Sequence, residues 1–235
     1  MDPATHELAC YIQKHLDRTT VNLVRTERLV CLADQIYPNA PDGLQLYRQD
    51  IIRAAVVFLH ATLEDFLRHV GSMYLPKCGE DVLNRVALVG SSDVLRPEKF
   101  FLGRLASHRS KSVDQLISES VAAYLDRVSF SDTGEISRLL EAIGVPLDPI
   151  RRFYAPLSSL MARRHQIVHK GDLLDAPSDG PREAMTIDGT VVMEWHAAVQ
   201  AFMSAVIAQK IEHDFAEKLK RRVSTHTPDN DNIAS

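Results

Sequence analysis

The sequence predicts an all-α protein, a helical bundle with one small β-hairpin inserted near residues 185–193. Two observations predict the helices. Apolar side chains recur every three or four residues over most of the chain, which is the spacing of one face of an α-helix. The interruptions between these stretches carry proline, glycine and capping residues, which mark the ends of helices.

Two long helices are predicted in the first third of the chain. The first covers residues 5–37 and is ended by the Pro-Asn-Ala-Pro-Asp-Gly stretch at 38–43. The second covers residues 47–73, and Pro76 ends it. Its apolar positions form a wide stripe, so we expect this helix to pack on more than one side and to lie at the centre of the bundle.

Shorter helices are predicted in the middle of the chain. One covers residues 81–88, and another begins near Arg96-Pro97. A capping box at Ser112 begins a helix that reaches residue 128. The next helix is short and ends before Gly144, because glycine commonly follows the last turn of a helix.

A further helix begins at Asp148-Pro149, where aspartate is a good N-cap and proline is favoured at the first helical position. We call it the motif helix. It should run to about His169, with a kink at Pro156, and Gly171 should end it.

The chain closes with a predicted hairpin and a long helix. Met185 to Met193 places β-branched residues around Asp188-Gly189, a dipeptide typical of hairpin turns. The helix covers residues 195–219. We therefore expect one helical domain over residues 1–222, with the N-terminal helix at 5–37 and the core at 47–222, and a flexible tail at 223–235.

Composition limits the class of protein. The net charge is −4, so nucleic-acid binding would need a local basic patch. The cysteines Cys10, Cys31 and Cys78 are scattered, which fits neither a disulfide framework nor a zinc site and suits a reducing compartment. We see no secretory signal and no apolar run near the roughly 20 residues of a membrane span. We expect a cytoplasmic protein with no membrane partner.

Reactive side chains are concentrated at the end of the motif helix. Arg164 carries a fixed charge and can bind a phosphate through two N–H groups. His169 supplies an imidazole, which can accept or donate a proton in catalysis. RNA carries its own nucleophile, the 2′-hydroxyl, so its cleavage needs an acid, a base and charge stabilisation but no metal or other cofactor. The pattern therefore favours RNA as the substrate.

Five basic residues against two acidic ones also favour a polyanion. The acids are Asp148 and Asp172, at the two ends of the segment, and the excess of three positive charges would attract phosphates. Arg163 could instead form a salt bridge, and the first two arginines could lie on a solvated helix face. The basic residues are Arg151, Arg152, Arg163, Arg164 and Lys170.

Two other interpretations of the histidines stay open. His165 and His169 are four residues apart and share a helix face, a spacing that would also suit a metal pair with Asp172 as a third ligand. Both could equally be structural. No further metal signature accompanies them, so we expect no metal.

The residues Arg164-His165-Gln166-Ile167-Val168-His169, followed by Lys-Gly-Asp, resemble the signature of the HEPN superfamily, and the longer RRHQIVHKGD string resembles its RiboL-PSP-HEPN branch. Residues 57–68 (VFLHATLEDFLR) are similar to an early helix of that branch. The resemblance implies that Arg164 and His169 are the catalytic pair and that His165 takes the polar position. It places Glu64 at an acidic position on the early helix, with Asp65 as the adjacent alternative.

The resemblance further implies a helical, dimeric, metal-independent endoribonuclease, often a toxin or an anti-phage effector. Positions five apart on a helix differ by about 140°, so one chain offers an incomplete site and a homodimer would complete it. Expected partners are RNA, a second copy, and an antitoxin or an activating sensor. The alternatives are an inactive RNA- or nucleotide-binding module and a scaffold subunit of a larger complex. Gly171 occupies the place where some relatives carry a tyrosine that their antitoxins modify.

Overall fold

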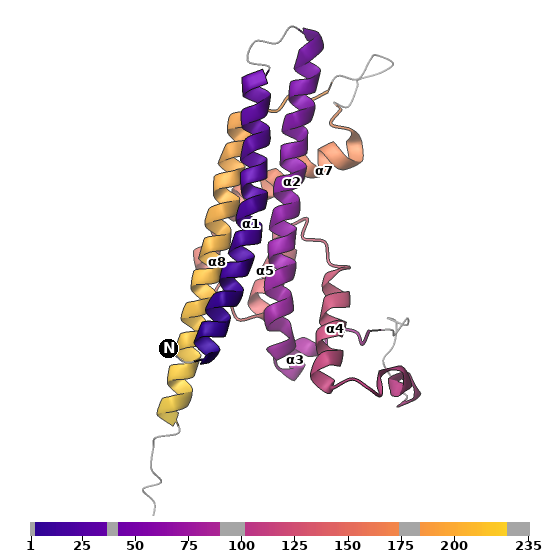
Figure 1. Ribbon diagram of the computed structural model, residues 1–235, viewed down its shortest axis with the longest axis vertical. Coiled ribbons are helices and arrows are strands. Elements are labelled where there is room, and N and C mark those ends of the chain that lie inside the picture. The colour runs from indigo at the N-terminus through magenta and orange to yellow at the C-terminus, as the bar shows by residue number, and fades with distance from the viewer. Residues whose placement is uncertain (1–2, 37–41, 90–101, 174–183, 225–235) are drawn as a thin grey trace, which may run out of the picture.

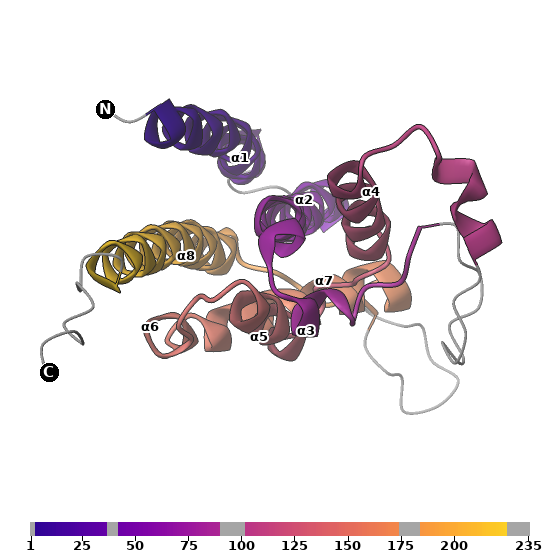
Figure 2. The same ribbon diagram turned by 90° about the horizontal axis from the view of Figure 1, so that it is seen from below.

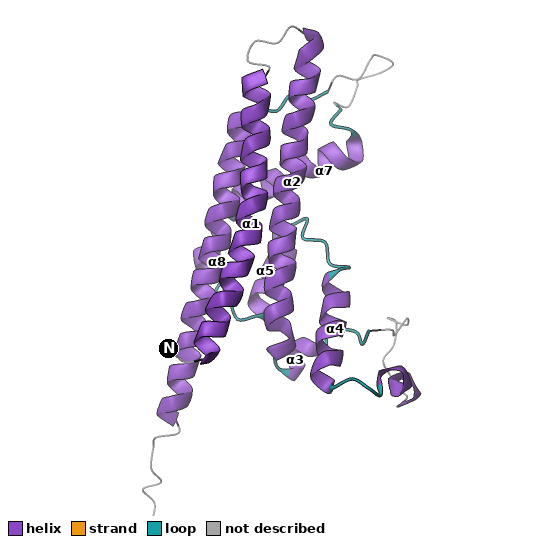
Figure 3. Cartoon of the chain, viewed as in Figure 1, coloured by secondary structure: helices purple, strands orange, loops and turns teal. Residues whose placement is uncertain are grey.

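The computed structural model describes residues 3–36, 42–89, 102–173 and 184–224. Three long helices lie side by side and set the length of the molecule (Figure 1). They are α1 (Pro3–Ile36), α2 (Asp42–Tyr74) and α8 (Gly189–Ser224). Within the described residues every named element is a helix, as Figure 3 shows, so the all-α prediction is confirmed.

Shorter elements cover the other side of α2. Figure 2 shows α2 between α1 and the group formed by α4, α5 and α7, and contacts with each of these helices agree with that view. The wide apolar stripe of α2 is thereby explained. In chain order the shorter elements are η1 (Leu75–Lys77), α3 (Glu80–Leu83), η2 (Leu102–His108), α4 (Val113–Leu125), α5 (Thr133–Ala142), α6 (Asp148–Arg151) and α7 (Tyr154–Lys170).

The core is built around α2, as its sequence predicts. Leu59, Leu63 and Leu67 are fully buried, and they recur at four-residue intervals along one side of the helix. Phe66 meets Phe202 of α8 edge to face, with ring centroids 6.4 Å apart. Burial of each such side chain stabilises the fold by roughly 1.5–3 kcal/mol, so α2 anchors the helices around it.

Helix α8 also contributes apolar side chains to the core. Its Gly189–Glu217 segment is long and apolar enough to pass a test for membrane spans by length and composition. In the fold, however, Val199, Phe202 and Val206 are fully buried, and α8 packs on α1, α2 and α7. These contacts account for the apolar character of α8 as that of a core helix.

The predicted β-hairpin at 185–193 is wrong. Helix α8 already begins at Gly189, and Asp188 accepts a hydrogen bond from the Thr190 backbone at 3.0 Å, as a helix-capping aspartate does. Gln49 of α2 exchanges hydrogen bonds with the backbone N–H and carbonyl of Ile187, at 2.8 and 3.2 Å. A side chain thus satisfies the backbone groups that a partner strand would have used. The one β-bridge in the described residues joins Leu173 to Ala184.

The motif helix is shorter than predicted. Asp148 and Pro149 begin the separate short helix α6, whose N-cap is Leu147, and α7 starts afresh at Tyr154. Pro156 then falls in the first turn of α7, where its missing N–H costs nothing, so the chain breaks before the proline rather than bending at it.

The predicted capping of α4 and of α5 is confirmed, whereas the helix predicted at 81–88 is only the short helix α3, which ends at Leu83. Ser112 and Gln115 form the reciprocal capping box of α4, and Asp132 caps α5 through the Glu135 backbone at 2.9 Å. Gly144 has a φ of 77°, the left-handed conformation expected after a helix. The predicted helix start at Arg96-Pro97 and the tail from residue 225 lie outside the described residues.

Candidate functional site

The last two turns of α7 present a pair of exposed histidines. The rings of His165 and His169 lie 4.7 Å apart between centroids and are inclined at 44°. Both side chains are exposed, because they occupy a strip of α7 that no other described element covers. Lys170 is exposed beside them and ends the helix. The structure therefore brings together three of the residues that the sequence singles out.

Arg164 lies on another side of α7 and is half-buried. It is close enough to His60 of α2 to oppose protonation of that ring. Within the described part of the chain, no carboxylate forms an ion pair with Arg164. Its charge is therefore not neutralised by a direct partner among these residues, unlike that of the adjacent Arg163.

Glu64 is half-buried on α2, on the same side as His60. Its carboxylate is bound by Arg68, one turn further along, with Nη1 and Oε2 3.4 Å apart. Arg68 also donates hydrogen bonds to the backbone carbonyls of Leu125 at 3.2 Å and Val128 at 3.0 Å. Glu64 thus lies next to the site, paired with Arg68 instead of Arg164. The neighbouring Asp65 is also half-buried.

His60 is a residue of this region that the sequence analysis does not single out. Its side chain is buried close to the backbone of Phe130, and its Nε2 has no hydrogen-bond partner among the described residues. Burial lowers the pKa of His60; Glu64 raises this pKa, whereas Arg164 and Arg68 lower it. A sequence signal was present, since His60 precedes Glu64 by one helical turn within the 57–68 block.

Arg163 forms a buried ion cluster with Arg53 of α2 and Asp172. Asp172 Oδ2 accepts hydrogen bonds from Arg53 Nε at 2.7 Å and from Arg163 Nη2 at 2.9 Å. Both guanidinium groups also donate to the carbonyl of Met185, at 2.9 and 3.2 Å. Burial lowers the pKa of Arg163, and the charge of Asp172 counteracts that shift. The sequence left two roles open for Arg163, a contact to a polyanion and a salt bridge, and the structure shows the salt bridge.

This ion cluster sets the geometry at the end of α7. Gly171 and Asp172 both have positive φ, 63° and 58°, so the chain turns sharply after Lys170. The turn directs Asp172 into the protein, where the two guanidinium groups hold its Oδ2. Asp172 is therefore not placed as a third ligand beside His165 and His169. Among the described residues, no three histidine, cysteine or acidic side chains are grouped to hold a metal.

Arg151 and Arg152 lie beyond the other end of α7 from His169. The part of α7 (Tyr154–Lys170) that precedes the histidines separates them, which corresponds to roughly 16 Å of helix to His165 and roughly 22 Å to His169. Both are exposed, and the guanidinium of Arg152 lies 4.7 Å from the ring centroid of Phe153. The structure does not bring these two arginines to the histidine pair.

The arrangement offers two exposed imidazoles and a cation without an ion-pair partner among the described residues. Imidazoles can donate and accept protons, and a guanidinium stabilises negative charge on phosphate oxygens. Because Arg164 and His169 lie on different sides of α7, a second molecule or a substrate that wraps the helix would be needed to use both.

One family of known proteins matches most of the chain. The model of the RiboL-PSP-HEPN family matches residues 25–213, which include α2, α7 and most of α8. Neither the curated proteins nor the solved structures give a match. The match covers well over half of the chain and contains both motif blocks. The chain therefore belongs to the RiboL-PSP-HEPN family, a family of HEPN-type domains.

Proposed function

We propose that this protein is a metal-independent endoribonuclease whose active site is composed from two copies of the chain. The observation that carries the proposal is the exposed His165–His169 pair at the end of α7, next to an arginine that lacks an ion-pair partner among the described residues. The family often has ribonuclease activity, and the neighbouring Lys170 adds positive charge for the RNA backbone.

The proposed reaction is attack of the ribose 2′-hydroxyl on the adjacent phosphorus. A base takes the 2′-hydroxyl proton as the new O–P bond forms, and the bond from phosphorus to the 5′-oxygen breaks. An acid protonates that leaving oxygen, which gives a 2′,3′-cyclic phosphate and a 5′-hydroxyl. We assign proton transfer to His169, assisted by His165, and stabilisation of the phosphate charge to Arg164. Glu64 acts as a positioning residue through its ion pair with Arg68.

A homodimer would supply the second acid–base group. Val168 follows Arg164 by one turn on the same side of α7 and is 46% exposed. An exposed apolar side chain beside a charged one is typical of a surface that another protein covers. Two-fold pairing through this surface would bring two motif helices together.

Activity measurements on purified variants test the proposal. His169→Ala and Arg164→Ala should each lower the rate of RNA cleavage about 100-fold or more. Arg127→Ala is the matched control, since Arg127 is an exposed arginine that lies after α4. Products should carry cyclic phosphate ends, and EDTA should not inhibit. Equal cleavage by all four proteins would refute the assignment, and inhibition by EDTA would support a metal site instead.

A binding module is the second candidate. Two observations favour it. Arg164 and His169 lie on different sides of α7, and Glu64 forms an ion pair with Arg68. RNA that is bound yet intact after long incubation with the wild-type protein would support it. Expression of the chain alone in a bacterial host distinguishes a toxin or defence effector, which should slow growth unless an antitoxin or activator controls it.

A further inference from the structure

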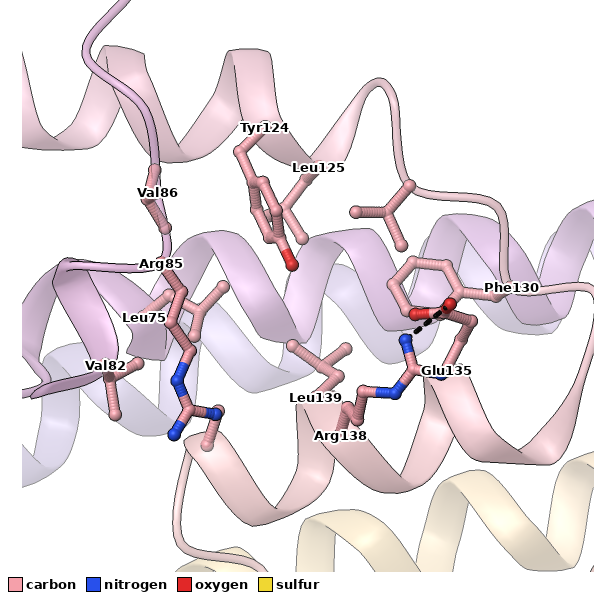
Figure 4. A pocket seen from close by; sticks show the side chains of 12 residues that line it. Leu75, Val82, Arg85, Val86, Tyr124, Leu125, Phe130, Glu135, Arg138 and Leu139 are labelled. Atoms are coloured by element: carbon pink, nitrogen blue, oxygen red, sulfur yellow. Dashed lines mark hydrogen bonds and ion pairs between the residues drawn. The ribbon is translucent and has the colours of Figure 1, made fainter. Parts of the chain in front are cut away.

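A second concave site lies away from the histidine pair, between α4, α5 and the segment from η1 to α3. Figure 4 shows its walls, which are mainly apolar and include Leu75, Leu125, Val128, Phe130 and Leu139. The cavity between them has a volume of about 90 Å³ and opens to solvent. It is smaller than a drug-sized site, so it would hold the apolar end of a small ligand whose other end lies at the mouth; small-molecule sites are commonly apolar with a few polar groups.

The polar groups at this cavity favour an anion. Arg85 and Arg138 each contribute a guanidinium group to its lining, and the hydroxyl of Tyr124 points inward (Figure 4). Glu135 is the single carboxylate of the lining and is paired with Arg138 at 2.6 Å. The lining therefore carries an excess of one positive charge beside an apolar space. A ligand with an apolar body and one negative group would complement it.

One wall of the cavity is hydrogen-bonded to Arg68, next to the candidate RNA site. Arg68 donates to the carbonyls of Leu125 and Val128, and it holds Glu64. The ring of His60 lies close to the backbone of Phe130, and Arg68 lies 5.9 Å from the Phe130 ring centroid. The same short segment thus forms one side of the cavity and fixes Arg68 and His60 next to Arg164.

We propose that this cavity binds a small amphipathic anion and that its occupancy strengthens RNA binding at the candidate site. Carbonyls of the cavity wall hold Arg68, which pairs with Glu64, so a ligand that packs against this wall stabilises the Arg68–Glu64 pair. With Glu64 neutralised, the charge of Arg164 is available to a phosphate. The coupling to RNA rests on the proposed function, whereas the ligand site does not.

Calorimetric titration with octanoate tests the ligand site, with octylamine as a control of equal length and opposite charge. Octanoate should bind one site with a Kd in about the millimolar range. The Arg85→Met/Arg138→Met double variant should weaken binding about tenfold or more by removing both cations. Ala142→Phe should abolish it by filling the space.

The exposed arginines can be replaced without disturbing the core, so the double variant remains informative if Ala142→Phe does not fold. Absence of saturable binding, or equal binding of octylamine, overturns the site.

RNA binding to the His169→Ala variant, which keeps the cavity and should leave RNA intact, tests the coupling. Saturating octanoate should lower the Kd for single-stranded RNA about fivefold. The same measurement in His169→Ala/Arg85→Met/Arg138→Met should show no change. An unchanged Kd in the cavity-intact protein overturns the coupling and leaves the ligand site standing. If RNA does not bind at all, the proposed function and the coupling both fail, and calorimetry still decides the ligand site.

Discussion

Arg163 and Asp172 are joined by a 2.9 Å ion pair that the two sharp turns after α7 make possible. The adjacent Arg164 lacks such a partner among the described residues. Two neighbouring arginines of one motif therefore have different surroundings. Arg163 fixes the end of α7 to α2 and to the segment before α8, and Arg164 remains available to a ligand.

Asp172→Ala should destabilise the fold by about 3 kcal/mol, because it leaves the guanidinium group of Arg163 buried without a counter-ion and leaves Arg53 with only the exposed carboxylate of Asp50. Urea unfolding followed by circular dichroism measures the change. Asp34→Ala is the matched control, since the Arg48–Asp34 pair is far more exposed and its loss should cost at most about 1 kcal/mol. Similar losses for both variants would contradict a stabilising role for the buried cluster.

Stability should decrease as the pH falls below about 6.5, the ordinary pKa of histidine. Burial lowers the pKa of His60 in the folded state, so the unfolded chain takes up a proton first as the pH falls. The contribution of His60 is therefore fully present above pH 6.5 and is lost below it.

Urea midpoints at pH 7.5 and pH 5.5 measure this pH dependence. His60→Gln should reduce the difference between the two midpoints, whatever its own effect on stability. The control is His165→Gln, because His165 is exposed. The explanation fails if His60→Gln retains the full pH dependence.

Periodicity and capping predicted most of the fold, and the errors have physical causes. Asp188-Gly189 suits a hairpin turn and a helix start equally well, and the choice depends on Gln49, which binds the preceding Ile187 from 138 residues away in sequence. Likewise, the ion pair of Arg163 needs the conformation of Asp172 and the approach of Arg53 from α2. Such pairings arise only when distant segments pack together.

The candidate site was predicted in part. The exposure and the proximity of His165 and His169 follow from their four-residue spacing near a helix end. The role of His60 could not be derived in this way, because it depends on the packing of α2 against α7 and on the backbone of Phe130.

Cys78 should react with iodoacetamide about tenfold more slowly than Cys31 at pH 8. Burial raises the pKa of the Cys78 thiol, which also donates hydrogen bonds to the carbonyls of Tyr74 and Ala142 at 3.3 Å each, while Cys31 is exposed. Peptide mass spectrometry over a time course gives both rates in one sample. In urea the two rates should become equal. Equal rates in the folded protein would show that the thiol of Cys78 is accessible.

Val168→Glu should dissociate the proposed homodimer and lower RNA cleavage in parallel. The new carboxylate would lie one turn from Arg164, where a two-fold contact would bring it against its own copy and bury like charges together. Sedimentation velocity over a concentration series should show the dimer Kd raised about 100-fold. Phe215→Glu is the control, because Phe215 is a more exposed apolar residue on α8. If Val168→Glu remains dimeric yet inactive, the composite site lies elsewhere on the surface. If the wild type and both variants are all monomeric at the same concentrations, the chain acts without a second copy.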